Sequence, residues 1–253
     1  MRLHLHEWGD PAAPPLVCLH GVSAHGGRFR KLAEERWADR FHVLAPDLRG
    51  HGRSGWEPPW STAQLVSDVL ETTGVAGMWL GHSLGARLVL EVAARRPELV
   101  QRAILLDPAI QVLPSVALDL AQQQCQDNSY GSIEEAVEAR RLIAELTPRE
   151  IIEEDMAEHL ARGPDGRYRL RCCRAAVASL FGELVTPPAR PETLRAETLL
   201  VYAPEFGLVH DEQVETYRAA LGERLIVVAV PGGHMVFWDA YEQTAAAIDS
   251  FLG

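Results

Sequence analysis

A serine stands between two glycines in the stretch "LGHSLGA" at residues 80–86, with Gly81 two positions before Ser83 and Gly85 two positions after it. An apolar run that ends in "MWLG" precedes the serine and a helical pattern follows it. Ser83 is therefore predicted at a tight strand-to-helix turn, where a bulky side chain at either glycine position would collide with its neighbours. This context indicates a serine nucleophile held out for chemistry rather than an ordinary glycine-rich turn.

A serine hydroxyl needs a general base, which is usually a histidine oriented by a carboxylate. Among the ten histidines, His234 follows the apolar run "VVAVPGG" and precedes the last helical pattern. It is therefore predicted on a loop at the carboxyl edge of the sheet, the same edge as Ser83, and to act as the base. His4 and His6 are interpreted as the solvent face of the first strand, and His159 as a residue on a helix surface.

The tetrahedral intermediate of acyl transfer needs backbone N–H donors. The predicted donors are the amide of Leu84, directly after the nucleophile, and the amide of Val22 in the loop "LHGVS", where Gly21 allows close approach. His20 on that loop is interpreted as a brace of the loop, and His82 as lining the pocket or the turn. His20 and His82 are also candidate substrate contacts.

The elements that must position these residues alternate between strands and helices. Short apolar runs that end in turn residues predict buried parallel strands at 15–21, 42–47, 77–83, 103–107, 197–204 and 224–233, after a half-exposed strand at 2–8. A helix at 61–74 begins with a possible capping box of Ser61 and Gln64. The alternation predicts the α/β class, with a doubly wound, mostly parallel sheet.

One long segment breaks this alternation. Residues 108–197 carry helical patterns and few strand signals. We interpret this segment as a helical cap inserted into a core made of residues 1–107 and 198–253.

Composition narrows the functional classes. The chain has 253 residues, of which 47% are hydrophobic, and a net charge of -11, which disfavours a nucleic-acid partner. No apolar stretch approaches the roughly 20 residues that span a bilayer, so no membrane partner is expected.

The N-terminus lacks the apolar run of a signal peptide, and Cys18 is interpreted as a small buried hydrophobe. A cytoplasmic location is the resulting expectation. The sequence does not indicate the oligomeric state.

The motifs together resemble the α/β-hydrolase superfamily. They occur in that family's order and spacing, and are "LHG" (19–21), "DLRGHGRS" (47–54), "GHSLGA" (81–86) and "PGGH" (231–234). The resemblance covers essentially the whole chain, with the 108–197 segment as a helical cap, and it implies structural roles for Asp47 and Arg49. Members with an aspartate nucleophile cleave carbon–halogen bonds or epoxides, whereas the serine here implies acyl transfer to water.

The acid of the triad departs from the family pattern. Most members carry it after the seventh strand, where this chain reads "VYAPEFGLV" and places Phe206 at the acid position, with Glu205 one residue away. The family's other solution, an acid after the sixth strand, corresponds to Asp107 in "AILLDPAI". Asp107 is the favoured acid and Glu205 the alternative. Asp211, or no acid at all, is the remaining interpretation.

These observations predict a carboxylesterase-like serine hydrolase that cleaves a small or medium carboxylic ester or lactone through an acyl-enzyme. The expected partner is a small-molecule acyl substrate, and the mechanism requires no metal or organic cofactor. A carbon–carbon bond hydrolase, a perhydrolase or a lyase of the same fold is the alternative, and a non-catalytic ligand-binding protein is a further one.

Two groups of residues are weaker candidates for substrate contact. Trp56 and Trp60 in "GWEPPW" can contact substrate or pack in the core or lid. The arginines at 140, 141, 171 and 174 are interpreted as solvated helix faces, any one of which could instead pair with a substrate carboxylate.

Overall fold

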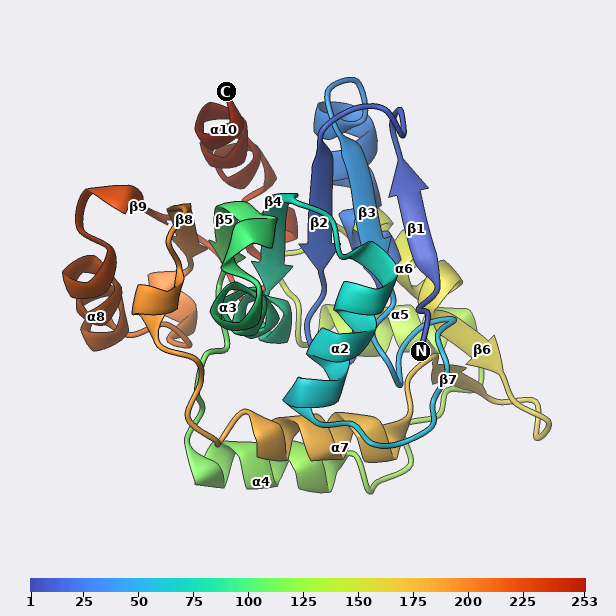
Figure 1. The fold of residues 1–253 in the computed structure, drawn as a ribbon. Coiled ribbons are helices and arrows are strands. Elements are labelled where there is room, and N and C mark those ends of the chain that lie inside the picture. The colour runs from blue at the N-terminus through green and yellow to red at the C-terminus, as the bar shows by residue number, and fades with distance from the viewer.

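A seven-stranded sheet forms the centre of the protein, which we describe over residues 1–253 from a computed structural model (Figure 1). The strand order is β1-β3-β2-β4-β5-β8-β9. The strands span Leu5–Trp8 (β1), Pro15–Leu19 (β2), His42–Pro46 (β3), Gly77–His82 (β4), Val100–Leu106 (β5), Glu197–Tyr202 (β8) and Leu225–Ala229 (β9). Only β1 runs antiparallel to its neighbour. The predicted fold class, a mostly parallel doubly wound sheet, is confirmed.

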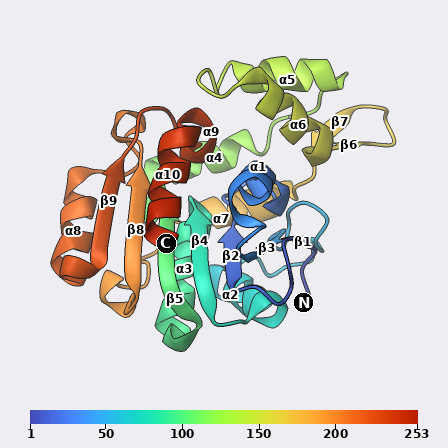
Figure 2. The same cartoon turned by 90° about the horizontal axis from the view of Figure 1, so that it is seen from above.

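Helices cover both faces of the sheet (Figure 2). One face carries α2 (Thr62–Thr73), α3 (Leu84–Arg95) and α8 (Asp211–Leu221). The other carries α1 (Arg30–Leu32), the π-helical turn η2 (Ala33–Trp37), α9 (Val236–Asp239) and α10 (Tyr241–Leu252). In β2, Val17 and Leu19 join the first core while Leu16 and Cys18 join the second, as the two-residue period of a strand requires.

The ends of two helices differ from the sequence prediction. Ser61 Oγ accepts a hydrogen bond from the Gln64 amide at 3.2 Å, but the Gln64 side chain donates to Asp68 instead of returning to Ser61. Only half of the capping box therefore forms. The last helical pattern is two helices, because the chain turns at Ala240, which has ψ 53°.

The segment between β5 and β8 forms two helical pairs. Helix α4 (Pro114–Gln123) packs on α7 (Arg174–Glu183), and α5 (Ile133–Arg141) packs on α6 (Arg149–His159). A hairpin of β6 (Leu160–Arg162) and β7 (Tyr168–Leu170) follows α6. Strands of three residues are too short to show an alternating pattern, so the sequence did not reveal this hairpin.

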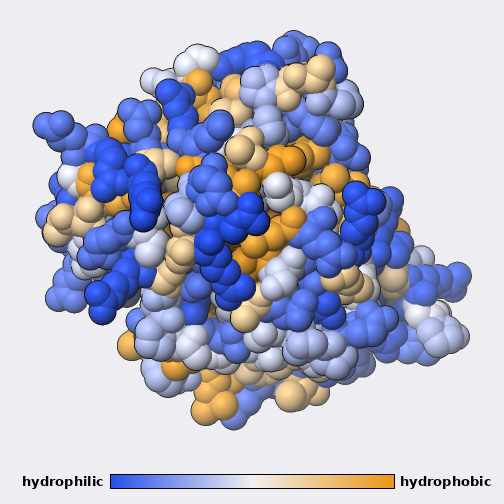
Figure 3. All heavy atoms as spheres, viewed as in Figure 1, coloured by the Kyte–Doolittle hydropathy of each residue, from blue (hydrophilic) through white to orange (hydrophobic).

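The outer surface of α4 carries exposed apolar side chains, seen at the lower edge of Figure 3. Leu113, which precedes the helix, is 69% exposed, and Val116 and Leu118 are also exposed. No helix of the protein is both long and apolar enough to cross a bilayer.

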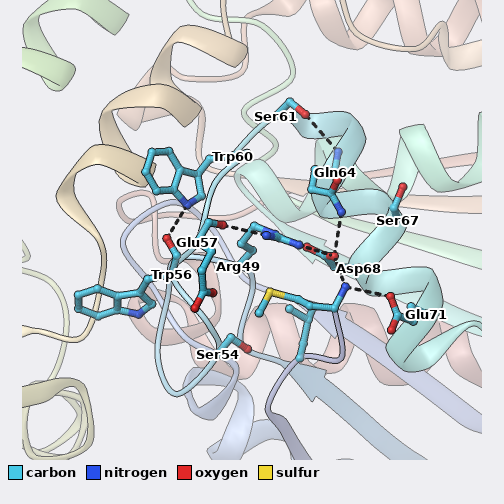
Figure 4. A network of polar contacts seen from close by, with 12 residues as sticks. Arg49, Ser54, Trp56, Glu57, Trp60, Ser61, Gln64, Ser67, Asp68 and Glu71 are labelled. Carbon is cyan, nitrogen blue, oxygen red and sulfur yellow. Dashed lines mark hydrogen bonds and ion pairs between the residues drawn. The ribbon is translucent and has the colours of Figure 1, made fainter.

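A buried ion pair joins the 47–60 loop to helix α2 (Figure 4). Arg49 donates to Asp68 through Nε at 2.6 Å and Nη2 at 2.9 Å, and the amino group of Met1 lies 2.8 Å from the same carboxylate. Asp47 forms separate bonds, accepting from the amides of Gly26 and Arg53 at 2.8 Å each. Asp47 and Arg49 thus both have the structural role that the resemblance implied, and each bonds to its own set of partners.

We expect Asp68→Asn to lower the free energy of unfolding at pH 7 by about 3 kcal/mol, because it leaves the Arg49 guanidinium without its buried counter-charge. Urea unfolding measures this. Burial opposes ionisation, yet hydrogen bonds from Arg49 and Met1 hold the pKa of Asp68 below its ordinary value. The carboxylate therefore stabilises the fold above about pH 4, and the difference between variant and wild type must shrink as the pH falls below that value.

The matched control is Glu71→Gln, which removes an exposed carboxylate from the same helix. We expect it to change stability by about 0.5 kcal/mol or less. Equal losses in Asp68→Asn and Glu71→Gln would contradict a structural role for the buried pair.

Candidate active site

Ser83 lies on a sharp turn between β4 and α3, with the strained backbone angles φ 55° and ψ -121°. Its amide donates to the carbonyl oxygen of Leu106 at 3.0 Å, which fixes the turn against β5. A Cβ added at Gly81 would lie 2.3 Å from the Gly85 backbone, and one added at Gly85 would lie 2.0 Å from the Leu19 carbonyl oxygen. Neither position accepts a side chain, so the two glycines make this turn possible.

His234 and Asp107 meet at the carboxyl edge of the sheet. His234 lies on the loop after β9, and its Nδ1 is 2.6 Å from Asp107 Oδ2. Asp107 follows β5 directly, is fully buried, and has a positive φ of 36°. Its Oδ1 accepts from the Ala203 amide at 3.2 Å. Because the carboxylate accepts, His234 Nδ1 carries a proton and Nε2 is left to take one from a nucleophile.

The alternative acids do not reach the imidazole. Glu205 lies in the short helix η5 (Pro204–Phe206), is exposed, and forms no hydrogen bond or ion pair. Asp211 is exposed in the first turn of α8. Phe206 stacks on His234, with ring centroids 5.2 Å apart and planes inclined by 14°. This stacking had no sequence signal, since it depends on the path of the loop after β8.

His82 ties the serine turn to the histidine loop. Its Nε2 donates to the carbonyl oxygen of His234 at 2.9 Å, and the two rings lie 4.5 Å apart. Burial, and then the neighbouring His234, hold the pKa of His82 well below its ordinary value, so it stays neutral. His82 therefore braces the site, and its assignment as a substrate contact stays a prediction. No direct hydrogen bond joins Ser83 to the His234 ring, and such bonds often tighten only when substrate binds.

Two free amides lie at the serine. A Cβ added at Gly21 would lie 2.9 Å from Ser83 Cβ, so the loop after β2 passes directly beside the nucleophile. The amide of Val22 on that loop donates no hydrogen bond within the protein. Leu84 is the first residue of α3, so its amide has no acceptor within the helix. Both predicted oxyanion donors are therefore available.

The other predicted substrate contacts have different surroundings. His20 is buried, accepts from the Leu48 amide at 2.9 Å, and donates to the Gly21 carbonyl at 2.8 Å. Both of its ring nitrogens are used in bracing the loop, and its assignment as a substrate contact stays a prediction. Trp60 donates to the Trp56 carbonyl at 3.1 Å beside the Arg49 network (Figure 4). Neither tryptophan forms a hydrogen bond or ring contact with Ser83 or His234.

The chain belongs to the α/β-hydrolase family. The sequence model of the α/β-hydrolase fold matches residues 14–139. The chain is 29% identical over 258 residues to lipase LipV of Mycobacterium tuberculosis, covering 99% of this chain and 98% of that protein. The crystal structure of E-2-(acetamidomethylene)succinate hydrolase superposes with a TM-score of 0.85 and 26% identity over 99% of this chain and 94% of that one. A marine microorganism esterase has the same fold, with a TM-score of 0.80 at 20% identity over 99% of both chains.

These relatives are lipases, esterases and other hydrolases. With the fold described above, they define the chain as a hydrolase of the α/β-hydrolase family.

Proposed function

We propose that the protein is a serine hydrolase that cleaves carboxylic esters through an acyl-enzyme. The observation that carries the proposal is the 2.6 Å bond between His234 and Asp107, at the sheet edge where Ser83 sits on a strained turn. A buried acid, an oriented imidazole and a serine on a strand-to-helix turn are the parts of a Ser-His-Asp triad. The lipase and esterase names of relatives support an ester as substrate.

The proposed cycle uses only groups of this chain and water. His234 Nε2 takes the Ser83 proton as Oγ attacks the substrate carbonyl, and the amides of Val22 and Leu84 hold the oxyanion. Asp107 stabilises the imidazolium while His234 gives the proton to the leaving alcohol. Water then attacks the acyl-enzyme by the same steps, releasing the acid and restoring Ser83.

The test is hydrolysis of p-nitrophenyl esters of increasing acyl length, together with labelling by a fluorophosphonate. We expect burst kinetics with the esters, and one phosphonate group on the peptide that contains Ser83, identified by mass spectrometry. Ester turnover without labelling of Ser83, or no turnover of any ester or lactone, would contradict the proposal.

The surroundings of Arg140 on α5 bear on which esters the protein prefers. Its Nε is buried without a hydrogen-bond partner, and its guanidinium forms no ion pair. Burial and the charge of Arg28 lower the pKa of Arg140 to about 10. Burial is the largest and the charge of Arg140 the smallest of the contributions that lower the pKa of His82, the histidine that ties the serine turn to the His234 loop. Arg141, in contrast, pairs with Glu138 at 3.0 Å.

A cation that is partly buried and has no ion pair is stabilised by an anion that binds beside it. We therefore propose that the preferred esters carry a carboxylate on the acyl group. The structurally similar hydrolase that is named for a succinate derivative supports this choice.

We expect Arg140→Gln to lower kcat/KM for p-nitrophenyl hemisuccinate by about 10- to 100-fold, mainly through KM, because a charge-assisted hydrogen bond contributes about 1.5–3 kcal/mol. The uncharged ester p-nitrophenyl valerate should change by less than about 2-fold. Arg141→Gln is the control, since it removes the same charge from the neighbouring position. Equal losses with both esters would show that Arg140 only supports the fold.

A further inference from the structure

Three histidines and a glutamate that the proposed mechanism does not use gather in one place. His6 lies on β1, His25 precedes the short helix η1 (Gly26–Phe29), and Glu158 and His159 end the cap helix α6. All four line one narrow hollow between the core and the cap, together with Arg53 and Arg171. The sequence interpretation of His6 as solvent-facing and of His159 as a helix-surface residue is wrong, since His6 is 10% exposed and His159 is fully buried.

Buried carboxylates fix the tautomers of His6 and His25. Asp47 Oδ1 lies 3.1 Å from His6 Nε2, and Asp155 Oδ1 lies 2.9 Å from His25 Nε2. A carboxylate accepts, so each Nε2 carries the proton and each Nδ1 keeps a lone pair. A histidine that donates its second nitrogen to a carboxylate is the usual arrangement around a protein-bound metal.

His159 shows the same pattern with a backbone acceptor. Its Nε2 donates to the carbonyl oxygen of Ser23 at 3.1 Å, and its ring stacks on His25 with centroids 4.7 Å apart. Its Nδ1 is buried and has no hydrogen-bond partner. A buried acceptor left unpaired is costly, and a bound ligand in this hollow would remove that cost.

Glu158 completes the donor set. Its Oε1 lies 3.8 Å from His6 Nδ1, while Arg30 donates to its Oε2 at 2.7 Å and holds the carboxylate in place. A Cβ added at Gly27 would lie 2.8 Å from this carboxylate, so a glycine at that position gives the carboxylate its room.

We propose that His6, His25 and Glu158 bind one Zn²⁺ ion that joins the cap to the core. One ligand atom from each of the three residues lies within 4.8 Å of the other two, so small shifts bring them to coordination distance. Two neutral imidazoles and one carboxylate are ligands that Zn²⁺ favours, whereas Mg²⁺ and Ca²⁺ favour all-oxygen sets. These three residues leave the fourth position of the ion open.

The ion would connect two parts of the chain that are far apart in sequence. His6 and His25 belong to the core, whereas Glu158 belongs to the cap helix α6. Binding therefore stabilises the docked position of the α5–α6 pair. It acts apart from the Ser83 chemistry, so its test is independent of the proposed esterase activity.

The test is titration of the chelator-treated full chain with ZnCl₂, followed by calorimetry and by thermal unfolding. We expect one equivalent to bind with a Kd of about 1 µM or tighter, and the Tm to rise by about 5–10 °C when free zinc reaches about 100 times Kd. Glu158→Gln and His6→Gln should each weaken binding by at least about 100-fold, with the metal-free Tm checked for each variant. MgCl₂ should give no shift.

Glu154→Gln is the matched control, because Glu154 is an exposed carboxylate one turn earlier on α6. It should bind zinc within about 2-fold of wild type. Zinc binding that survives both Glu158→Gln and His6→Gln, that disappears on thiol alkylation, or that is weaker than about 0.1 mM would overturn the proposal. If one variant fails to fold, the other decides.

Discussion

Ser83→Ala is expected to lower kcat for p-nitrophenyl ester hydrolysis by about 10⁴- to 10⁶-fold and to abolish labelling by fluorophosphonate. The size of the effect follows from the loss of the attacking oxygen, which leaves only binding and oxyanion stabilisation. Ser83 Oγ forms no hydrogen bond within the protein, so its removal should alter the free energy of unfolding by about 0.5 kcal/mol or less. Steady-state kinetics and urea unfolding measure the two quantities on the same preparation.

The control for this variant is Ser67→Ala. Ser67 is an exposed serine of α2 that bonds only to the Ala63 carbonyl of its own helix. It should leave kcat and labelling unchanged. If Ser83→Ala keeps more than about 1% of wild-type kcat, or if it loses activity only because it unfolds, Ser83 is not the nucleophile.

The sequence predicts those parts of the candidate site whose signals are local. Ser83 stands in a motif with fixed neighbours, and Val22 and Leu84 follow from the two loops that such a turn needs. His234 is predicted from its place between the last strand and the last helical pattern. In each case a few adjacent residues carry the information, and the strand-and-helix alternation brings them to one sheet edge.

The remaining residues depend on tertiary contacts that no short stretch encodes. Whether Asp107 or Glu205 faces His234 is decided by how the loops after β5 and β8 bend. The histidines at the core–cap junction are separated by up to about 150 positions, and only the docking of α6 brings His159 to His25. The sequence alone indicates surface positions for His6 and His159 and gives no signal for His25, so their burial and shared hollow required the structure.

Asp107→Asn is expected to reduce kcat by about 10⁴-fold at pH 7. An asparagine keeps the shape and can still accept from the Ala203 amide through its oxygen. Its NH₂ group then faces His234 Nδ1 and donates to it, which places the imidazole proton on Nε2. The ring can no longer accept the Ser83 proton. The loss should therefore appear in kcat rather than KM, and both are measured with the same ester.

Glu205→Gln provides the matched control, because it makes the same acid-to-amide change on an exposed side chain that does not reach the imidazole. It should keep kcat within about 2-fold of wild type. A second test uses Phe206, whose ring lies 5.2 Å from that of His234, at the position where the family resemblance implies the usual acid. Phe206→Asp introduced into Asp107→Asn should recover kcat by about 10-fold or more, since a carboxylate there can again hold the proton on Nδ1. A larger loss in Glu205→Gln than in Asp107→Asn would transfer the acid role to Glu205. Adding His234→Ala to the double variant should abolish the recovered activity, because that activity depends on the His234 imidazole.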